Sequence, residues 1–316
     1  MVSVKEKKIK GKSYLYAEYS FRLPDSSVKK ISKLIRSKED ISSKALKRFF
    51  LDKEIEAYKR YALRRYSAGR ILDKGKIQKI ESFRAEFRQI IRNLTKKQFK
   101  DILDRFTVNF TYESNAIEGN SLTLKDVTLV LHENIVPEGK DLREIYETNN
   151  TREANGMLFS SKIDISKRGM IKLHRMLVKD TGVSFGFKKL PNYLLMRDVK
   201  TAPPEKVEEE IDGLISWYEK NRGHEHPVRL AAEFHGRFEK IHPFEDGNGR
   251  VGRMLINAML LEEGYPPIII RKTMRQPYFS ALEAYDKGHK DKLIRFLLER
   301  MEKTFENFFK IYIRYI

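Results

Sequence analysis

The sequence contains no cysteine in its 316 residues. This absence excludes disulfide bonds, a thiolate nucleophile and a cysteine-ligated zinc site. Long apolar runs are missing as well, since no stretch approaches the roughly 18 residues that a membrane-spanning helix needs. The N-terminal segment MVSVKEKKIKGK also lacks the apolar stretch of a signal peptide. We therefore expect a cytoplasmic protein that does not interact with membranes.

Acidic residues are scarce in one part of the chain, which has a net charge of +19. Residues 1–100 contain 29 Lys and Arg but 11 Asp and Glu, whereas residues 101–316 contain 34 and 33. The positive excess therefore belongs to the N-terminal third. Binding of nucleic acid by residues 1–100 is one explanation, and a charge-rich solvated surface is the other.

Hydrophobic residues make up 41% of the chain and aromatic residues 11%, which is enough for a packed core. The alternating run SYLYAEYSFRL predicts a small basic β-hairpin or meander within residues 1–40. The pattern then becomes helical, and Thr95 with Gln98 forms a capping box that starts a helix. Further helices are predicted at roughly 124–132, 141–161, 166–180, 205–221, 227–241, 249–263, 276–287 and 290–313. The sequence thus predicts a mainly α protein with three parts, 1–40, 41–107 and 108–316.

The segment HPFEDGNGRVGR, residues 242–253, links two amphipathic helices and has the composition of an anion-binding loop. Gly247 and Gly249 flank Asn248 and allow the backbone to approach a ligand closely. The N–H groups at the start of the second helix would face this loop, and a helix N-terminus binds phosphate readily. We therefore expect a phosphate site here.

Charged and titratable side chains lie in the same segment. Arg250 and Arg253 are three residues apart on one helix face, and their planar guanidinium groups suit phosphate. Asp246 offers a carboxylate, and magnesium bound together with phosphates needs only one or two of these. Histidine is the side chain best suited to act as a general base near neutrality, and His242 stands at the loop entrance. Together these residues predict nucleotidyl or phosphoryl transfer.

A second motif, TYESNAIEGN, occupies residues 111–120. Ser114 and Glu118 are one helical turn apart, and Gly119 follows as a helix C-cap. We expect a short helix at about 109–119. A carboxylate at a helix C-terminus opposes the macrodipole, so Glu118 is either solvated or compensated by a cation.

The segment 242–253 resembles the signature of the Fic family, His-x-Phe-x-(Asp/Glu)-Gly-Asn-Gly-Arg-x-x-Arg, at every fixed position. The resemblance extends from about residue 108 to about 300. It implies a Fic-type helical bundle with a short β-hairpin flap at about 186–199. It also implies a protein adenylyltransferase that moves AMP from ATP to a Ser, Thr or Tyr hydroxyl of a target protein or of the chain itself. Dimerisation is common in the family, so a homodimer is a further expectation.

The same resemblance implies a role for each residue of the motif. His242 would deprotonate the target hydroxyl, Asp246 would hold Mg²⁺ (with Mn²⁺ as an alternative), and the two arginines would contact the outer phosphates of ATP. Tyr278 and Asp286 would contact the adenine. The α- and β-phosphates would lie in an anion hole formed by Gly247, Asn248 and Gly249.

The motif Ser114-x-x-x-Glu118-Gly119 is similar to the inhibitory helix of the Fic proteins that carry it before the core (class II). In that class the Glu pairs with the second arginine of the signature, here Arg253, and occupies the γ-phosphate site. Two alternatives remain on the same fold, removal of AMP from a modified protein and transfer of another nucleotide or of phosphocholine. A third alternative is a nucleic-acid-associated regulator that uses the site as a nucleotide sensor.

Overall fold

The computed structural model describes residues 2–192 and 199–315, which belong to two compact units. The first unit contains Met1–Leu94 and Ile311–Ile316, and the second contains Thr95–Lys310. In the part of the chain that the structure describes, no helix is both long and apolar enough to cross a membrane.

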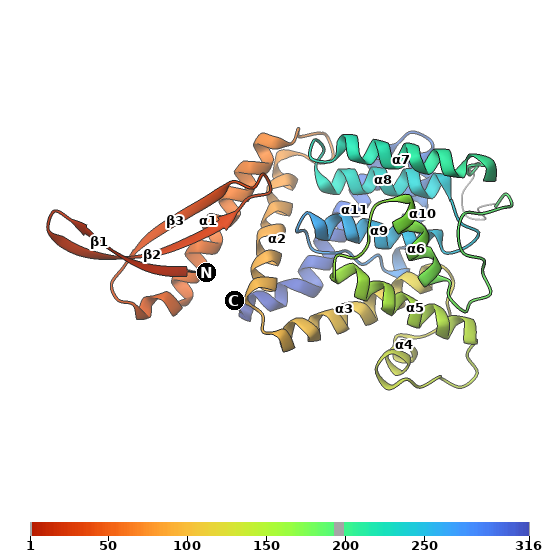
Figure 1. Cartoon of the computed structure of the whole chain (residues 1–316), viewed down its shortest axis with the longest axis horizontal. Coiled ribbons are helices and arrows are strands. Elements are labelled where there is room, and N and C mark those ends of the chain that lie inside the picture. The colour runs from red at the N-terminus through yellow and green to blue at the C-terminus, as the bar shows by residue number, and fades with distance from the viewer. Residues whose placement is uncertain (1, 193–198, 316) are drawn as a thin grey trace. The chain divides into compact units, whose positions relative to one another are not determined.

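The N-terminal unit consists of a three-stranded antiparallel sheet and two helices (Figure 1). Ser43 starts the first helix by accepting a hydrogen bond from a backbone N–H, and Asp73 starts the second helix in the same way. The sheet has the strand order β1-β2-β3, so the predicted β meander is confirmed. The elements are β1 (Val2–Ile9), β2 (Lys12–Arg22), β3 (Val28–Ile35), α1 (Lys44–Arg65) and α2 (Lys74–Asn93).

One face of this sheet packs on α1. Tyr19 and Phe21 of β2 are buried there with apolar residues of the helix. Glu54 of α1 is fully buried but not isolated, because the Tyr19 hydroxyl donates to its carboxylate at 2.6 Å and Arg92 lies 3.2 Å away. A buried charge is costly unless it is paired and hydrogen-bonded. These contacts therefore account for a carboxylate in the core of the unit.

The second unit is a bundle of helices, as the pattern predicted. Its helices are α3 (Lys96–Ile117), α4 (Leu124–Thr128), α5 (Leu142–Phe159), α6 (Lys167–Leu177), α7 (Val207–Asn221), α8 (Pro227–Ile241), α9 (Asn248–Glu262), α10 (Arg275–Asp286) and α11 (Lys290–Thr304). Short 3₁₀ or π turns lie at Glu39–Ser42, Leu129–Glu133, Pro204–Lys206, Lys272–Met274, Phe305–Phe309 and Lys310–Tyr315.

Two expectations differ from the structure at α3. The predicted boundary between residues 107 and 108 lies inside this helix, and the short helix expected at about 109–119 is the C-terminal part of α3, which ends at Ile117. The reason is local, because the sequence places no proline or glycine between residues 96 and 117 that would interrupt the helix. The Thr95–Gln98 capping box starts α3 as expected.

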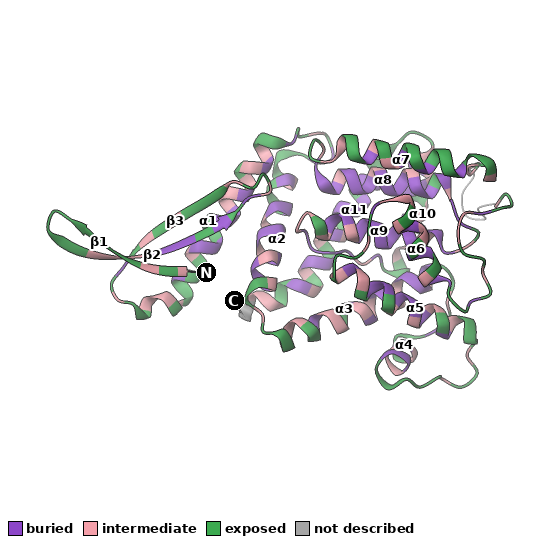
Figure 2. Ribbon diagram, in the orientation of Figure 1, coloured by how far each residue is buried: buried purple, intermediate pink, exposed green. Residues whose placement is uncertain are grey.

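Helices α8 and α9 lie at the centre of this bundle. Helix α9 packs against α3, α5, α6 and α8, while α8 also contacts α7, α10 and α11. Figure 2 shows that both helices are largely buried. The loop that joins α8 to α9 is therefore anchored at both ends by the core of the bundle.

Candidate active site

The loop between α8 and α9 begins at His242, whose backbone is left-handed, with φ 50° and ψ 63°. This conformation is uncommon for a residue other than glycine, and it persists where the surrounding structure enforces it. Gly247, with φ 79°, immediately precedes α9. The chain thus turns sharply at both ends of the loop, and the first N–H groups of α9 have no helical partners.

The side chain of Asn248 holds the loop closed. Its oxygen accepts a hydrogen bond from the N–H of Phe244 at 2.8 Å, and its amide group donates to the carbonyl of Phe244 at 2.8 Å. Asn192 donates to the same carbonyl at 2.9 Å. Both polar groups of Asn248 therefore stabilise the loop, and its backbone N–H is the group left for a phosphate.

His174 supports the loop from α6. Its ring stacks on Phe244 with the ring centres 3.9 Å apart. Nδ1 accepts a hydrogen bond from Gly186 N–H at 3.2 Å, so Nε2 carries the proton and donates to the carbonyl of Asp246 at 3.0 Å. Burial lowers the pKa of His174 to about 4, so the ring is neutral and structural.

The end of α3 brings a carboxylate to the N-terminus of α9. Glu118 Oε1 lies 2.7 Å from Arg253 Nη2, and Arg253 also donates to the Ser114 hydroxyl at 3.0 Å and carbonyl at 2.9 Å. A Cβ atom on Gly249 would lie 2.1 Å from Glu118 Oε1, so only glycine leaves room for the carboxylate. Glu118 therefore occupies the place where the start of α9 would bind an anion.

Two contacts, one from the first residue of α10 and one from the turn before it, hold the end of α3 in place. Arg275 donates through Nε to the carbonyl of Ile117 at 2.7 Å, and the N–H of Lys272 donates to Glu113 at 2.7 Å. A cation at a helix C-terminus also interacts favourably with the macrodipole. Gly119, with φ 103°, then ends the helix as expected.

Asp246 forms ion pairs with two arginines. Its Oδ2 lies 2.5 Å from Arg143 and 3.5 Å from Arg250, and Arg250 lies 3.1 Å from Glu147. The Asp246 side chain is 38% exposed, so its chemistry and position fit Mg²⁺ bound together with phosphates. Within the described ranges no three His, Asp or Glu side chains form a metal-binding cluster, so phosphate oxygens and water would have to complete the shell. A metal ion bound at Asp246 would compete with Arg143 for Oδ2.

A buried carboxylate lies behind His242. The Nδ1 atom of His242 is 3.8 Å from Glu239 Oε2, and Glu239 is 4% exposed. Glu239 Oε1 lies 4.0 Å from Nε2 of His235, which is fully buried. A carboxylate at this distance favours a protonated imidazole. Glu239 is therefore placed where it would stabilise a positive charge on His242 if this residue acted as a base.

Tyr278, which the resemblance assigns to the adenine, lies in the interior of the bundle, and its contact with the base stays a prediction. It is 1% exposed, its hydroxyl is 2.6 Å from Nε2 of His235, and its ring centre is 5.7 Å from that of Phe296. Burial raises the pKa of its hydroxyl above the ordinary value. The sequence pattern of α10 does not distinguish a buried tyrosine from an exposed one.

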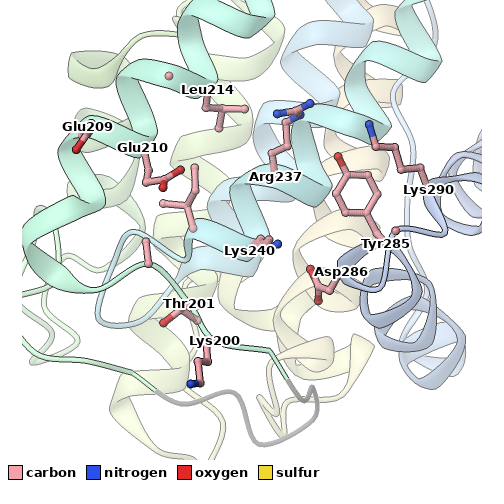
Figure 3. Close-up of a pocket in the computed structure, with 14 residues that line it drawn as sticks. Lys200, Thr201, Glu209, Glu210, Leu214, Arg237, Lys240, Tyr285, Asp286 and Lys290 are labelled. Carbon is pink, nitrogen blue, oxygen red and sulfur yellow. The ribbon is translucent and has the colours of Figure 1, made fainter.

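Asp286 lines a pocket of about 830 Å³ between α7, the end of α8 and the end of α10 (Figure 3). Arg237 and Lys240 of α8 line the same pocket. So does Ile241, the residue directly before the candidate base His242 in the sequence. This position is compatible with the expected adenine contact of Asp286, which stays a proposal.

The flap expected at 186–199 lies partly outside the described residues, because 193–198 are not among them. At its start, Phe187 forms a β-bridge with Phe244 of the loop. The rings of these two residues also stack, with centres 5.9 Å apart. The first residues of this segment are therefore attached to the loop between α8 and α9.

Lys188 strengthens this attachment. Its N–H donates to the carbonyl of Pro243 at 2.9 Å, and its ammonium group donates to Asn192 at 2.7 Å and to Thr201 at 3.1 Å. The side chain is buried, and burial lowers its pKa to about 8. Lys188 thus links the loop to Asn192 and Thr201.

Four charged residues of the site were not identified from the sequence. Glu239 is three residues before His242, and this helical spacing was the signal that could have indicated it. The other three are Arg143, Glu147 and Lys188, and nothing in their spacing connects them with a loop about 60 to 100 residues away.

Comparisons with known proteins agree with this geometry. Residues 164–260 match the model of the Fic/DOC family. The curated "Protein adenylyltransferase Fic" of Nematostella vectensis is 31% identical over 200 residues, which cover 62% of this chain and 47% of the relative. The protein of the same name from Drosophila melanogaster is 31% identical over 199 residues, which cover 62% of this chain and 40% of the relative. The chain therefore spans less than half the length of these relatives.

Solved structures show the same fold. A Fic domain containing signaling protein from Bacteroides thetaiotaomicron has a TM-score of 0.67 and 25% identity, with 75% of this chain and 96% of that chain covered. A Fic family protein from Desulfovibrio desulfuricans has a TM-score of 0.63 and 22% identity, with 78% and 76% covered.

Proposed function

Because the chain carries a domain of the Fic/DOC family, we propose that it transfers AMP from ATP to a protein hydroxyl and that Glu118 restrains this transfer. The observation that carries the proposal is the convergence at the N-terminus of α9. A histidine in a left-handed turn, the first N–H groups of a helix, which have no helical partners, and two buried arginines lie together there within twelve residues, 242–253.

The proposed reaction is a displacement at the α-phosphorus of ATP. The oxygen of the target hydroxyl forms a bond to this phosphorus, its proton passes to His242, and the bond to the bridging oxygen breaks so that pyrophosphate leaves. Since Nδ1 of His242 faces Glu239, Nε2 is the nitrogen that accepts the proton. Glu239 then stabilises the resulting imidazolium.

The start of α9 binds the phosphates in this proposal. Backbone N–H groups of Asn248 and Gly249 donate to the phosphate oxygens, and Arg250 and Arg253 neutralise the charge that moves to the leaving pyrophosphate. Mg²⁺, held through Asp246, would supply further neutralisation of the phosphates. A target protein supplies the hydroxyl, and the chain itself is one such target.

Inhibition follows from competition for the same groups. The carboxylate of Glu118 pairs with Arg253 and lies against Gly249, where a phosphate of ATP would need the same positive charge and the same space. Release requires the end of α3 to move, and Ser114 and Ile117 hold it through their bonds to arginines. A signal that loosens this end of α3 would therefore activate the transfer.

The test combines Glu118→Gly with mass spectrometry. The variant is incubated with ATP and Mg²⁺, alone and in a cell lysate, and modified peptides are sequenced. We expect one AMP group on a Ser, Thr or Tyr hydroxyl, and no modification by Glu118→Gly/His242→Ala. Phosphate, UMP or phosphocholine in place of AMP contradicts the proposal. Removal of AMP from a premodified protein by the unsubstituted chain would support the alternative of AMP removal.

A further inference from the structure

The solvent-facing side of the N-terminal sheet carries lysines next to tyrosines. Strand pairing places Lys5 opposite Tyr16 and Lys7 opposite Tyr14, with all four side chains on one face because of the alternation along each strand. The Lys7 ammonium group lies 4.8 Å from the centre of the Tyr16 ring. Leu34, which is 54% exposed, is paired with Tyr16 on the same face.

The aromatic residues of β2 divide between the two faces of the sheet. Tyr19 and Phe21 are buried against α1 in the core of the unit. Tyr14 and Tyr16 point to the opposite face and are half-buried. Packing in the core therefore explains the aromatic side chains at Tyr19 and Phe21, but it does not explain those at Tyr14 and Tyr16.

A single carboxylate lies among the lysines of this face in the described strands. Glu18 is 3% exposed and lies 2.8 Å from Lys30, 3.2 Å from Lys7 and 3.3 Å from Lys5. The Lys30 ion pair, with help from the other two lysines, holds the pKa of Glu18 down to about 2. One negative charge thus positions three positive charges and leaves an excess of two.

The hairpin end of the sheet extends this positive charge. Strand β3 pairs with β2 from Leu15 to Arg22, so residues 7–14 project beyond β3 (Figure 1). These eight residues contain no acidic side chain and four lysines, Lys7, Lys8, Lys10 and Lys12. Residues 1–94 as a whole contain 26 Lys and Arg against 11 Asp and Glu.

We propose that this face, made up of Lys5, Lys7, Lys12, Tyr14, Tyr16 and Lys30, binds single-stranded nucleic acid. The lysines would neutralise successive phosphates of the strand. The two tyrosine rings, on alternate residues of one strand, would stack on unpaired bases, whose flat faces are open in a single strand but not in a duplex. This lysine–tyrosine face lies in the unit without the Fic site, and the inference is independent of the proposed AMP transfer.

Charge and stacking together favour nucleic acid over other anionic partners. An acidic peptide or an anionic membrane would use the lysines but would gain little from two stacked tyrosine rings. Both are therefore outcomes of the test rather than part of the proposal.

The first test measures salt dependence with the full-length chain and a fluorescent 20-nucleotide poly(dT) or poly(U) probe. For single strands the slope of log K against log salt is about −0.7 per neutralised phosphate, so four lysines predict a slope of about −3. Lys5→Gln/Lys7→Gln should reduce this slope by about 1.4 and weaken binding about tenfold at low salt. The matched control is Lys44→Gln/Lys47→Gln, which removes two exposed charges from α1 and should change binding less than twofold. An equal loss in both double variants would overturn the proposal.

The second test separates stacking from charge. Tyr14→Leu/Tyr16→Leu should weaken probe binding about tenfold and leave binding of heparin unchanged. Glu18→Gln should strengthen probe binding several-fold because the three lysines lose their internal partner, and thermal unfolding checks that the variants fold. No loss in the tyrosine variant overturns the proposal. Equally tight binding of polyglutamate or of phosphatidylserine vesicles does so as well.

Discussion

Replacing Glu118 by glutamine removes one negative charge from the N-terminus of α9 while the side chain keeps its size. Arg253 is buried, but Glu118 is 33% exposed, so their ion pair is weaker than a fully buried pair. Breaking a fully buried pair costs about 3–5 kcal/mol, and with this exposure we expect about 2 kcal/mol. That free energy corresponds to a rate of AMP transfer about 30-fold higher at low ATP concentration. The assay is the initial rate of incorporation from ATP labelled at the α-phosphate.

The control for this prediction lies on the same helix. Asp101→Asn also removes one carboxylate from α3, but Asp101 is exposed and lies near the N-terminus of the helix, far from Glu118 at its C-terminus. We expect its rate to equal that of the unsubstituted chain. If Glu118→Gln is as slow as the unsubstituted chain while Glu118→Gly is fast, bulk rather than charge blocks the site, and the electrostatic reasoning is refuted.

Three further predictions concern residues around the catalytic loop. Arg143→Ala should lower the Mg²⁺ concentration needed for half-maximal binding of a fluorescent ATP analogue. The decrease should be at most about fivefold, since the exposed ion pair with Asp246 contributes at most about 1 kcal/mol. If the variant needs a higher Mg²⁺ concentration instead, Arg143 assists metal binding. Glu239→Gln should move the acidic limb of the pH–rate profile of Glu118→Gly to lower pH, because His242 loses the carboxylate that stabilises its protonated form. An unchanged limb would exclude this coupling. In the folded chain, burial lowers the pKa of Lys188 from 10.5 to about 8, so between these pH values the unfolded chain binds more protons and the free energy of unfolding rises with pH. The Tm of the unsubstituted chain should therefore rise relative to that of Lys188→Met between pH 8 and pH 10. A Tm difference that stays constant over this range would contradict the buried charge.

The loop at residues 242–253 could be predicted as a candidate site because its polar and charged residues are contiguous in the sequence. His242, Asp246 and the two arginines lie within twelve residues, and the glycines between them indicate the turns that the structure contains. The contact between Glu118 and Arg253 joins residues that are 135 positions apart in the sequence. The residue pattern alone therefore did not decide whether Glu118 is solvated or paired with a cation. The structure shows the pair.

The features that the sequence did not indicate have equally local causes. Residue 108 was a reasonable boundary by motif, but the helix propensity of α3 is unbroken there, so the compact units divide at Leu94 instead. Tyr278 and Arg143 are residue types that occur both at surfaces and in interiors, and only tertiary packing assigns one to the core and the other to Asp246. On β2, alternation predicted a strand but not which of its faces is covered.

The most direct test of AMP transfer compares two positions of the label in ATP. With Glu118→Gly, we predict that label from the α-phosphate enters protein, that label from the γ-phosphate does not, and that Glu118→Gly/His242→Ala incorporates neither. Incorporation from the γ-phosphate, or equal α-phosphate labelling by the double variant, would contradict AMP transfer with His242 as the base.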